Sequence, residues 1–274
     1  MPAQPASASV PDASILLCEM IGYVAVLTLN RPSTRNSLSE AMIAQLHSTL
    51  NEIGEDKNVR AVVIAASGAA FSAGHDLKEL NARRSDVDGG RAYFASIMNA
   101  CSTMMQAIVH LPKPVIAAVQ GIATAAGCQL VASCDLAIAS EVARFATPGV
   151  DIGLFCSTPM VALSRNVARK QAMEMLLTGE PISAAVAKDI GLVNRVVPAG
   201  TERDVAIELA QKVALKPAHT VKLGKRAFYR QAEMSLAEAY CYAAEVMTEN
   251  MMSRDAEEGI CAFIEKREPE WQDP

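Results

Sequence analysis

Residues 113–139 read KPVIAAVQGIATAAGCQLVASCDLAIA and form a long apolar stretch. In a lipid bilayer a polar side chain inside such a stretch is costly and a glycine weakens the helix. The interruptions are Gln120, Gly121, Gly127, Gln129 and Asp135. The stretch therefore predicts a buried strand over residues 113–119, a small-residue loop over 121–127, a helix near 128–133 and a strand over 135–139.

Outward from this stretch, towards the N-terminus, the same order of strand, loop and helix occurs again. Residues 14–20 and 23–30 predict two strands of a hairpin, and Ser39 is the predicted N-cap of a helix over 40–53. A strand, a helix and a further strand in this order imply a right-handed crossover. The remaining predicted elements are a strand over 59–65, a small-residue loop over 68–74, and helices over 76–82 and 91–110.

Strand signals fade after Thr158, and amphipathic helices are predicted through to about Arg267. The length of 274 residues suits one large α/β domain with a helical addition. We expect a loose tail over residues 1–13, a core over 14–200 and a helical region over 201–274. That region either packs between subunits or covers its own sheet, and the pattern leaves both open.

Composition excludes several classes of function. Hydrophobic residues make up 51% and charged residues 20%, as in soluble globular proteins. An aromatic share of 4% and a net charge of −5 argue against nucleic-acid binding. The seven cysteines show neither a CxxC pair nor zinc-type Cys/His spacing, so we expect no metal site. Free thiols, and an N-terminal stretch without arginine, predict a cytoplasmic protein.

Two small-residue loops, within residues 71–77 and 120–128, each follow a predicted buried strand and run directly into a helix. The N–H groups of a first helical turn lack intrahelical acceptors, and small residues let a ligand approach them. Two such loops converging on one oxygen would suit a thioester carbonyl that gains negative charge. Loops of this kind are also a common packing solution, and spacing alone does not separate the two interpretations.

The chain resembles the enoyl-CoA hydratase/isomerase (crotonase) superfamily over about residues 14–271. The motifs that carry the resemblance are NRP (30–32), FSAGHDL (71–77), KPVIAAV (113–119), GCQL (127–130), LTG (177–179) and AFIEKR (262–267). The resemblance implies an α/β fold, a spiral of ββα units with a C-terminal helical trimerisation region, assembled as homotrimers or dimers of trimers. It also implies an acyl-CoA thioester as ligand, with coenzyme A as part of the substrate and no separate cofactor. Residues 125–135 and 145–149 resemble one branch of the superfamily in particular.

The resemblance further implies site residues. The backbone N–H groups of His75 and Ala126 would form an oxyanion hole. The expected residues along the coenzyme A path are Arg35, Ala73, Lys78, Phe263 and Lys266. Of these, Phe263 and Lys266 would reach the ligand of a neighbouring subunit, and Arg35 is the weaker candidate, for the coenzyme A phosphates.

The chain departs from the superfamily where a hydratase carries its two glutamates, because those positions match Gln129 and Gly149. Neither an amide nor a glycine exchanges a proton near neutral pH. Since each general acid or base contributes about 10²- to 10⁴-fold in rate, we expect weak or absent hydration. Enolate stabilisation by the backbone would remain.

Other interpretations stay open at this point. One is a non-catalytic acyl-CoA-binding protein. Another is an acyl-CoA decarboxylase using His75, although Cys156 stands where that branch of the superfamily has a tyrosine. Asp151 is a candidate displaced base, but its position in an alternating run favours a side chain turned away from the site. Cys156 is expected to be a half-buried thiol rather than a nucleophile.

Overall fold

The computed structural model describes residues 14–272, and the expected tail over residues 1–13 lies outside them. The main sheet has six strands in the order β1-β2-β3-β5-β7-β10. β1 and β2 pair as the expected antiparallel hairpin, and the other neighbours are parallel. The strands are β1 (Leu16–Ile21), β2 (Val24–Leu29), β3 (Ala61–Ala66), β5 (Val115–Val119), β7 (Leu136–Ser140) and β10 (Arg195–Val197).

A second, smaller sheet has the order β4-β6-β8-β9. Its strands are β4 (Ala70–Ser72), β6 (Ile122–Thr124), β8 (Arg144–Ala146) and β9 (Ile182–Ser183). β4, β6 and β8 are parallel to one another, whereas β9 is antiparallel to β8. The chain thus gives one strand to the main sheet and the next to the small sheet in three successive units, which is the spiral of ββα units that the family resemblance implied.

The small sheet corrects part of the sequence analysis. Residues 68–74 and 121–127 were expected to be loops, but each contains a three-residue strand. Strands were not expected after Thr158, yet β9 and β10 lie beyond that residue. Strands of two or three residues are too short to show an alternating pattern, which is why they leave no signal in the sequence.

The helices of the spiral agree with the predicted ranges to within a few residues. They are α1 (Glu40–Glu55), α2 (Leu77–Ala82), α3 (Arg91–His110) and α4 (Ala126–Ser133), with 3-10 turns η1 (Pro32–Thr34), η2 (Arg83–Ser85) and η3 (Pro148–Ile152). Ser39 caps α1, because its hydroxyl accepts a hydrogen bond of 3.2 Å from the N–H of Met42. The buried face of α1, with Met42, Leu46 and Leu50, belongs to the largest hydrophobic cluster.

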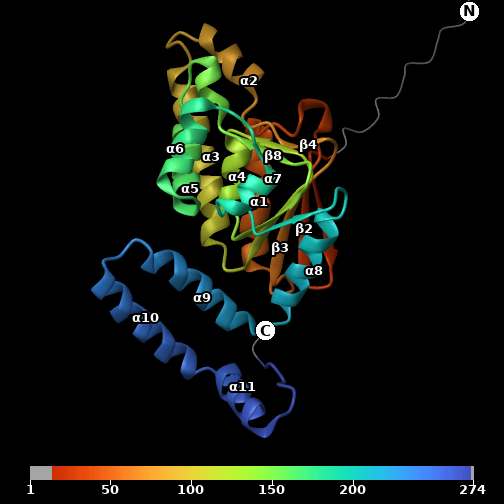
Figure 1. Ribbon diagram of the computed structural model, residues 1–274, viewed down its shortest axis with the longest axis vertical. Coiled ribbons are helices and arrows are strands. Elements are labelled where there is room, and N and C mark those ends of the chain that lie inside the picture. Colours follow the sequence, from red (N-terminus) through yellow and green to blue (C-terminus); the bar gives the residue numbers. More distant parts are fainter. Residues whose placement is uncertain (1–13, 273–274) are drawn as a thin grey trace, which may run out of the picture.

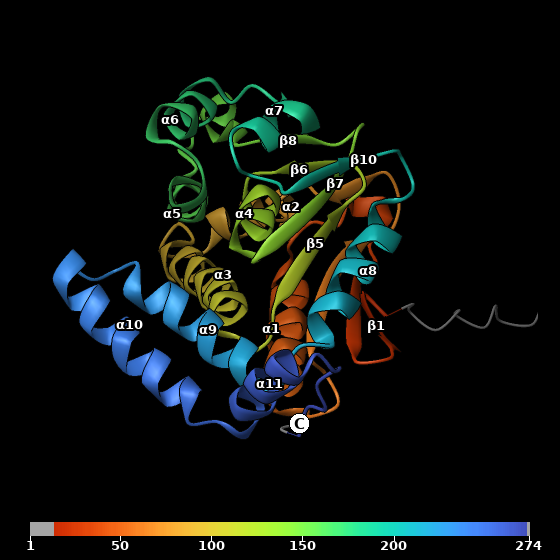
Figure 2. The same cartoon turned by 60° about the horizontal axis from the view of Figure 1, so that its bottom comes forward.

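The later helices are α5 (Ser157–Asn166), α6 (Arg169–Thr178), α7 (Ala184–Asp189), α8 (Glu202–Ala214), α9 (Ala218–Gln231), α10 (Leu236–Met251) and α11 (Arg254–Glu265). α8 covers one face of the main sheet, where Ala206 and Ala210 pack in a cluster with Val63 and Ile116. Figure 2 shows α8 on one side of the sheet and α1, α3 and α4 on the other. Of the two alternatives for the helical region, covering its own sheet thus applies to α8.

Helices α9 to α11, residues 218–265, form a C-terminal arm that extends away from the sheets (Figure 1). A buried polar cluster joins α9 to the spiral. The ammonium group of Lys225 donates to the carboxylate of Asp135 at 2.7 Å and to the carbonyl oxygen of Ile108 at 2.9 Å. Asp135 also accepts from the hydroxyl of Tyr229 at 2.9 Å and from the N–H of Val115 at 2.7 Å. This cluster thus links the start of β5, the start of β7 and the arm.

The arm carries a large apolar surface. Every side chain of α10 remains at least partly exposed, and Leu236, Tyr240 and Met247 are 77%, 73% and 60% exposed. On α11, Phe263 is 86% exposed. Such a surface, on helices with a clear apolar face, is far larger than the scattered apolar residues normal on a monomer.

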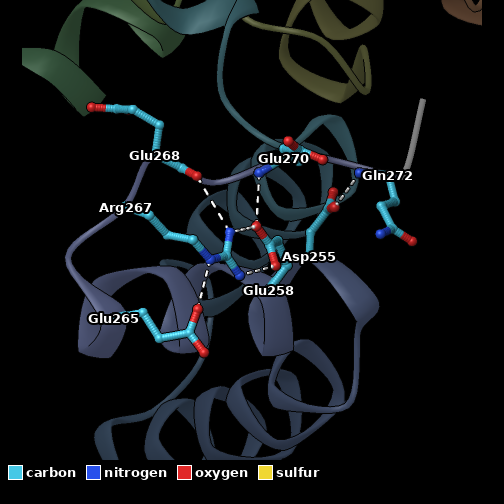
Figure 3. Close-up of polar contacts among 7 residues, drawn as sticks. All are labelled: Asp255, Glu258, Glu265, Arg267, Glu268, Glu270 and Gln272. Atoms are coloured by element: carbon cyan, nitrogen blue, oxygen red, sulfur yellow. Dashed lines mark hydrogen bonds and ion pairs between the residues drawn. The ribbon is translucent and has the colours of Figure 1, made fainter.

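The segment after α11 folds back along that helix (Figure 3). The guanidinium of Arg267 donates to Glu258 at 2.6 and 2.8 Å and to Glu265 at 2.7 Å. The N–H of Glu270 also donates to Glu258, at 2.8 Å. These bonds hold the pKa of Glu258 down at about 2 and fix the end of the arm.

Two further kinds of feature are absent from residues 14–272. No helix in that range is long and apolar enough to pass through a bilayer. Nor do three or more His, Cys, Asp or Glu side chains gather there in a group able to hold a metal ion.

Candidate functional site

Three parallel strands of the small sheet, β4, β6 and β8, end at the same edge. In open parallel sheets, ligands bind outside the carboxyl ends of the strands. β4 leads into residues 73–75 and then α2, while β6 leads through Ala125 into α4. We call residues 72–75 the first corner and residues 124–127 the second corner.

The two corners touch. A methyl group added to Gly74, which has a φ of +83°, would lie 3.0 Å from the carbonyl oxygen of Thr124 and 3.1 Å from the nitrogen of Ala126. One added to Gly127 would lie 2.3 Å from the carbonyl oxygen of Ser72. Only glycine allows backbones to approach this closely, so the small residues noted in the sequence are required by the contact between corners.

The amides predicted to act together lie at these corners. Within residues 14–272, the N–H groups of His75 and Ala126 take part in no turn, loop or cap hydrogen bond between backbone groups. Ala126 opens α4, where first-turn N–H groups lack acceptors. The preceding Ala125 has φ 50° and ψ −119°, a strained conformation held by a 2.9 Å bond from its N–H to the carbonyl oxygen of Ala146. Backbone strain of this kind concentrates at functional sites.

The segment before α1 lines the first corner. The carbonyl oxygen of Arg35 accepts from the N–H of Ala73 at 3.0 Å, and the N–H of Leu38 donates to the carbonyl oxygen of Gly74 at 2.7 Å. Lys78 lies exposed in the first turn of α2. The structure therefore brings Arg35, Ala73 and Lys78 together around one corner, with both cationic side chains at the surface.

Phe263 and Lys266 lie elsewhere in the chain. Phe263 is on α11 and Lys266 is its C-cap, so both belong to the arm. Figure 1 shows α11 at one end of the molecule and α2, next to the first corner, at the other. Within a single chain these two residues do not join the others.

Burial lowers the pKa of the His75 imidazole below its ordinary 6.5, an effect that the backbone of Leu38 offsets only in part. The ring is consequently neutral at pH 7. A neutral ring next to the corners offers no positive charge to an acidic acyl group.

The two residues that the resemblance matches to the glutamates of a hydratase, Gln129 and Gly149, are both buried. Gln129, one turn into α4, is 5% exposed. At Gly149 in η3, an added methyl group would lie 2.9 Å from the carbonyl oxygen of Leu154 and 3.0 Å from the sulfur of Cys156. Protein atoms therefore fill the space into which a side chain at residue 149 would extend.

Asp151 and Cys156 are poor candidates for chemistry. Asp151 is exposed, and its carboxylate lies beside Gly179 at the end of α6. Burial raises the pKa of the Cys156 thiol, and it raises that of neighbouring Cys128 to about 12. Both thiols are thus protonated at neutral pH, when a thiolate would be needed for attack.

One residue at this edge was not predicted from the sequence. Thr147 follows β8 directly, is 0% exposed, and has no hydrogen-bond partner for its hydroxyl within residues 14–272. The only signal was its place after a strand, and that strand was itself not predicted.

Comparison with known proteins identifies the family. The family model described as enoyl-CoA hydratase/isomerase matches residues 19–274. The enoyl-CoA hydratase domain-containing protein 3, mitochondrial, of Xenopus laevis is 49% identical over 245 residues, which are 89% of this chain and 82% of that protein. Its human counterpart is 47% identical over 89% of this chain and 79% of its own length.

Solved structures agree in fold. A crystal structure of human enoyl-CoA hydratase domain-containing protein 3 has a TM-score of 0.89 and 45% identity, covering 94% of this chain and 100% of that one. An enoyl-CoA hydratase from Mycobacterium smegmatis has a TM-score of 0.90 and 52% identity, covering 94% of this chain and 99% of that one.

The expected cytoplasmic location is wrong, because the relatives from Xenopus laevis and Homo sapiens are named mitochondrial proteins. All seven cysteines are indeed free. Free thiols, however, do not distinguish one reducing compartment from another. The match over nearly the whole chain, and the relatives of the branch indicated by residues 125–135, show that this chain belongs to the enoyl-CoA hydratase/isomerase (crotonase) family.

Proposed function

We propose that this protein binds acyl-CoA thioesters and stabilises an enolate-like oxygen with the backbone N–H groups of His75 and Ala126. The observation that carries the proposal is the contact between the two corners, where Gly74 approaches the nitrogen of Ala126. Fixed donors of this kind are worth roughly 10²- to 10³-fold in rate each, because they need no rearrangement as charge develops. The N-terminal end of α4 adds a favourable partial positive charge.

Hydration of an enoyl-CoA is expected to be weak or absent. Water addition needs a group that takes a proton from water and one that returns a proton to carbon. Gln129 and Gly149 supply neither, and the space in front of Gly149 is filled by Leu154 and Cys156. A protein that only binds acyl-CoA would use the same corners. We do not propose decarboxylation, because Cys156 stands where that branch of the superfamily has a tyrosine and burial lowers the pKa of His75.

The coenzyme A path is proposed to run past Arg35, Ala73 and Lys78, which surround the first corner. Two exposed cations there suit the coenzyme A phosphates. Phe263 and Lys266 are proposed to complete the site of a neighbouring copy in a homotrimer or dimer of trimers. The apolar arm that carries them supports this arrangement.

A calorimetric titration with butyryl-CoA, and the loss of enoyl-thioester absorbance on adding crotonyl-CoA, test these statements separately. We expect saturable binding of butyryl-CoA together with hydration at least about 10²-fold slower than in a hydratase with both glutamates. Absence of binding would overturn the proposed ligand class. Rapid hydration would leave the ligand class standing and refute the claim that the site lacks acid–base groups.

A further inference from the structure

The edge that holds the two corners has a third strand end. In the parallel set β4, β6 and β8, β6 lies in the middle, and Thr124 of β6 is in register with Ala146 of β8. The residue after Ala146 is Thr147. The bond from the N–H of Ala125 to the carbonyl oxygen of Ala146 ties this strand end to the second corner. Thr147 thus flanks the second corner on the side opposite the first.

Thr147 is fully buried, yet its hydroxyl oxygen has no hydrogen-bond partner within residues 14–272. The side-chain oxygen of Gln129, in the second turn of α4, is also buried and unpartnered over the same residues. Buried polar groups in folded proteins are nearly always paired, so exceptions at one place require an explanation. Thr147 and Gln129 lie on the two segments that adjoin the second corner, and both ring nitrogens of His75, in the first corner, are buried and unpartnered over the same residues as well.

A purely structural threonine would satisfy its hydroxyl locally. Thr178, Thr201 and Thr248 do so, each donating to a backbone carbonyl oxygen at 2.7 or 2.8 Å. Thr147 makes no such bond within the described residues. A valine of the same shape would avoid the cost of an unpaired hydroxyl at this position.

We propose that Thr147, assisted by Gln129, binds a hydrogen-bonding substituent on the acyl chain of the thioester and so determines substrate specificity. This inference rests on the proposed thioester site at His75 and Ala126. A hydroxyl and a carboxamide both donate and accept, and neither carries charge. They therefore fit an uncharged hydroxyl or oxo group close to the thioester carbonyl, rather than a carboxylate or a plain saturated chain.

The test compares two ligands of equal chain length, 3-hydroxybutyryl-CoA and butyryl-CoA, by calorimetric titration. Wild-type protein is expected to bind the hydroxylated ligand more tightly. Thr147→Val should lower the affinity for 3-hydroxybutyryl-CoA by about tenfold, while the affinity for butyryl-CoA stays within about threefold of wild type. Thr147→Ser, which keeps the hydroxyl, should restore the preference. Thr178→Val, which removes a hydroxyl on α6, should change neither affinity.

Every other result overturns either this inference or the proposed thioester site. Equal weakening of both ligands by Thr147→Val would assign the residue a structural role, and no change in either would exclude it from the site; both overturn the inference. Wild-type protein that binds both ligands without preference would overturn the inference alone. Wild-type protein that binds neither would overturn the proposed thioester site itself. Thermal unfolding of the valine variant shows that it is folded, and we expect its midpoint to equal or exceed that of wild type.

Discussion

At the scale of single residues, the site depends on how closely two backbones approach. Gly74 and Gly127 each face the opposite corner at a distance where a methyl group would meet backbone atoms. The positive φ of Gly74 adds a second reason for glycine at that position. Gly153 has a similar φ of +75°, but a methyl group there would meet no atom within 4 Å. A comparison of Gly74 with Gly153 therefore separates the cost of a positive φ from the cost of contact between the corners.

Gly74→Ala is expected to destabilise the protein by about 2–3 kcal/mol, because strain and overpacking add. Gly153→Ala should cost only about 1 kcal/mol, from strain alone. Affinity for butyryl-CoA should fall at least tenfold in the first variant and stay unchanged in the second. Denaturant unfolding and calorimetric titration measure both quantities. Equal losses of affinity would show that the spacing of the corners is not what binds the thioester.

His75 predicts a pH dependence. Because burial lowers its pKa in the folded protein, the unfolded chain binds the proton more readily below pH 6.5. Stability should therefore be unaffected by His75 above pH 6.5 and fall as the pH drops below it, by at most about 1.4 kcal/mol per pH unit. His75→Gln should remove this part of the pH dependence. Denaturant unfolding of both proteins from about pH 5 to about pH 7.5, which extends roughly one unit or more to each side of the ordinary histidine pKa, measures this pH dependence. If the stabilities of wild type and His75→Gln changed with pH in the same way, His75 would not be the source of this pH dependence.

At the scale of elements, the sequence predicted most long helices and strands and missed the short ones. Residues 91–110 were predicted as a helix and are α3, because a stretch of 20 residues is long enough for apolar side chains to recur at helical spacing over about five turns. β8 was missed because its three residues begin with exposed Arg144 and show no period. The two corners could be identified from their small residues and their place before helices. Their contact, and the place of Thr147 beside them, depend on the small sheet and could not be predicted.

The join between α9 and the spiral is an element-scale feature with a measurable cost. The side chains of Lys225 and Asp135 are 7% and 15% exposed, so Lys225→Met leaves a buried carboxylate without its main partner. We expect a loss of about 3–5 kcal/mol in unfolding free energy. Arg165→Met, which breaks an ion pair with Glu233 whose side chains are 58% and 67% exposed, should cost at most about 1 kcal/mol. Similar losses of unfolding free energy in Lys225→Met and Arg165→Met would mean that the buried cluster does not hold the arm.

At the scale of the whole molecule, the arm and the spiral differ in how they bury apolar surface. The spiral encloses two hydrophobic clusters, one on each face of the main sheet. The arm instead leaves Leu236, Tyr240 and Phe263 more than two-thirds exposed. Surfaces of that kind are typical of permanent contacts between subunits. The proposed homotrimer accounts for this difference within one chain.

Leu236→Asp should therefore shift the protein towards monomers in sedimentation velocity, because a carboxylate would be buried in the proposed contact. Val87→Asp, which replaces a fully exposed apolar residue between η2 and α3, should leave assembly unchanged. Leu236 is used rather than Phe263, since Phe263 is also proposed to contact ligand. Wild-type protein that sediments as a monomer would refute the proposed assembly at once.

The buried cluster at Asp135 also sets the order in which the fold loosens. It is a local, polar connection between α9 and an otherwise continuous hydrophobic spiral. In a separated copy, amide protons of α10 would exchange with solvent through openings that leave β3 protected, because no side chain of α10 is buried and, within residues 14–272, the arm adds no residue to the two hydrophobic clusters of the spiral. The arm would then behave as a separate unfolding unit, and association with other copies would be what gives it the lifetime of the rest of the protein.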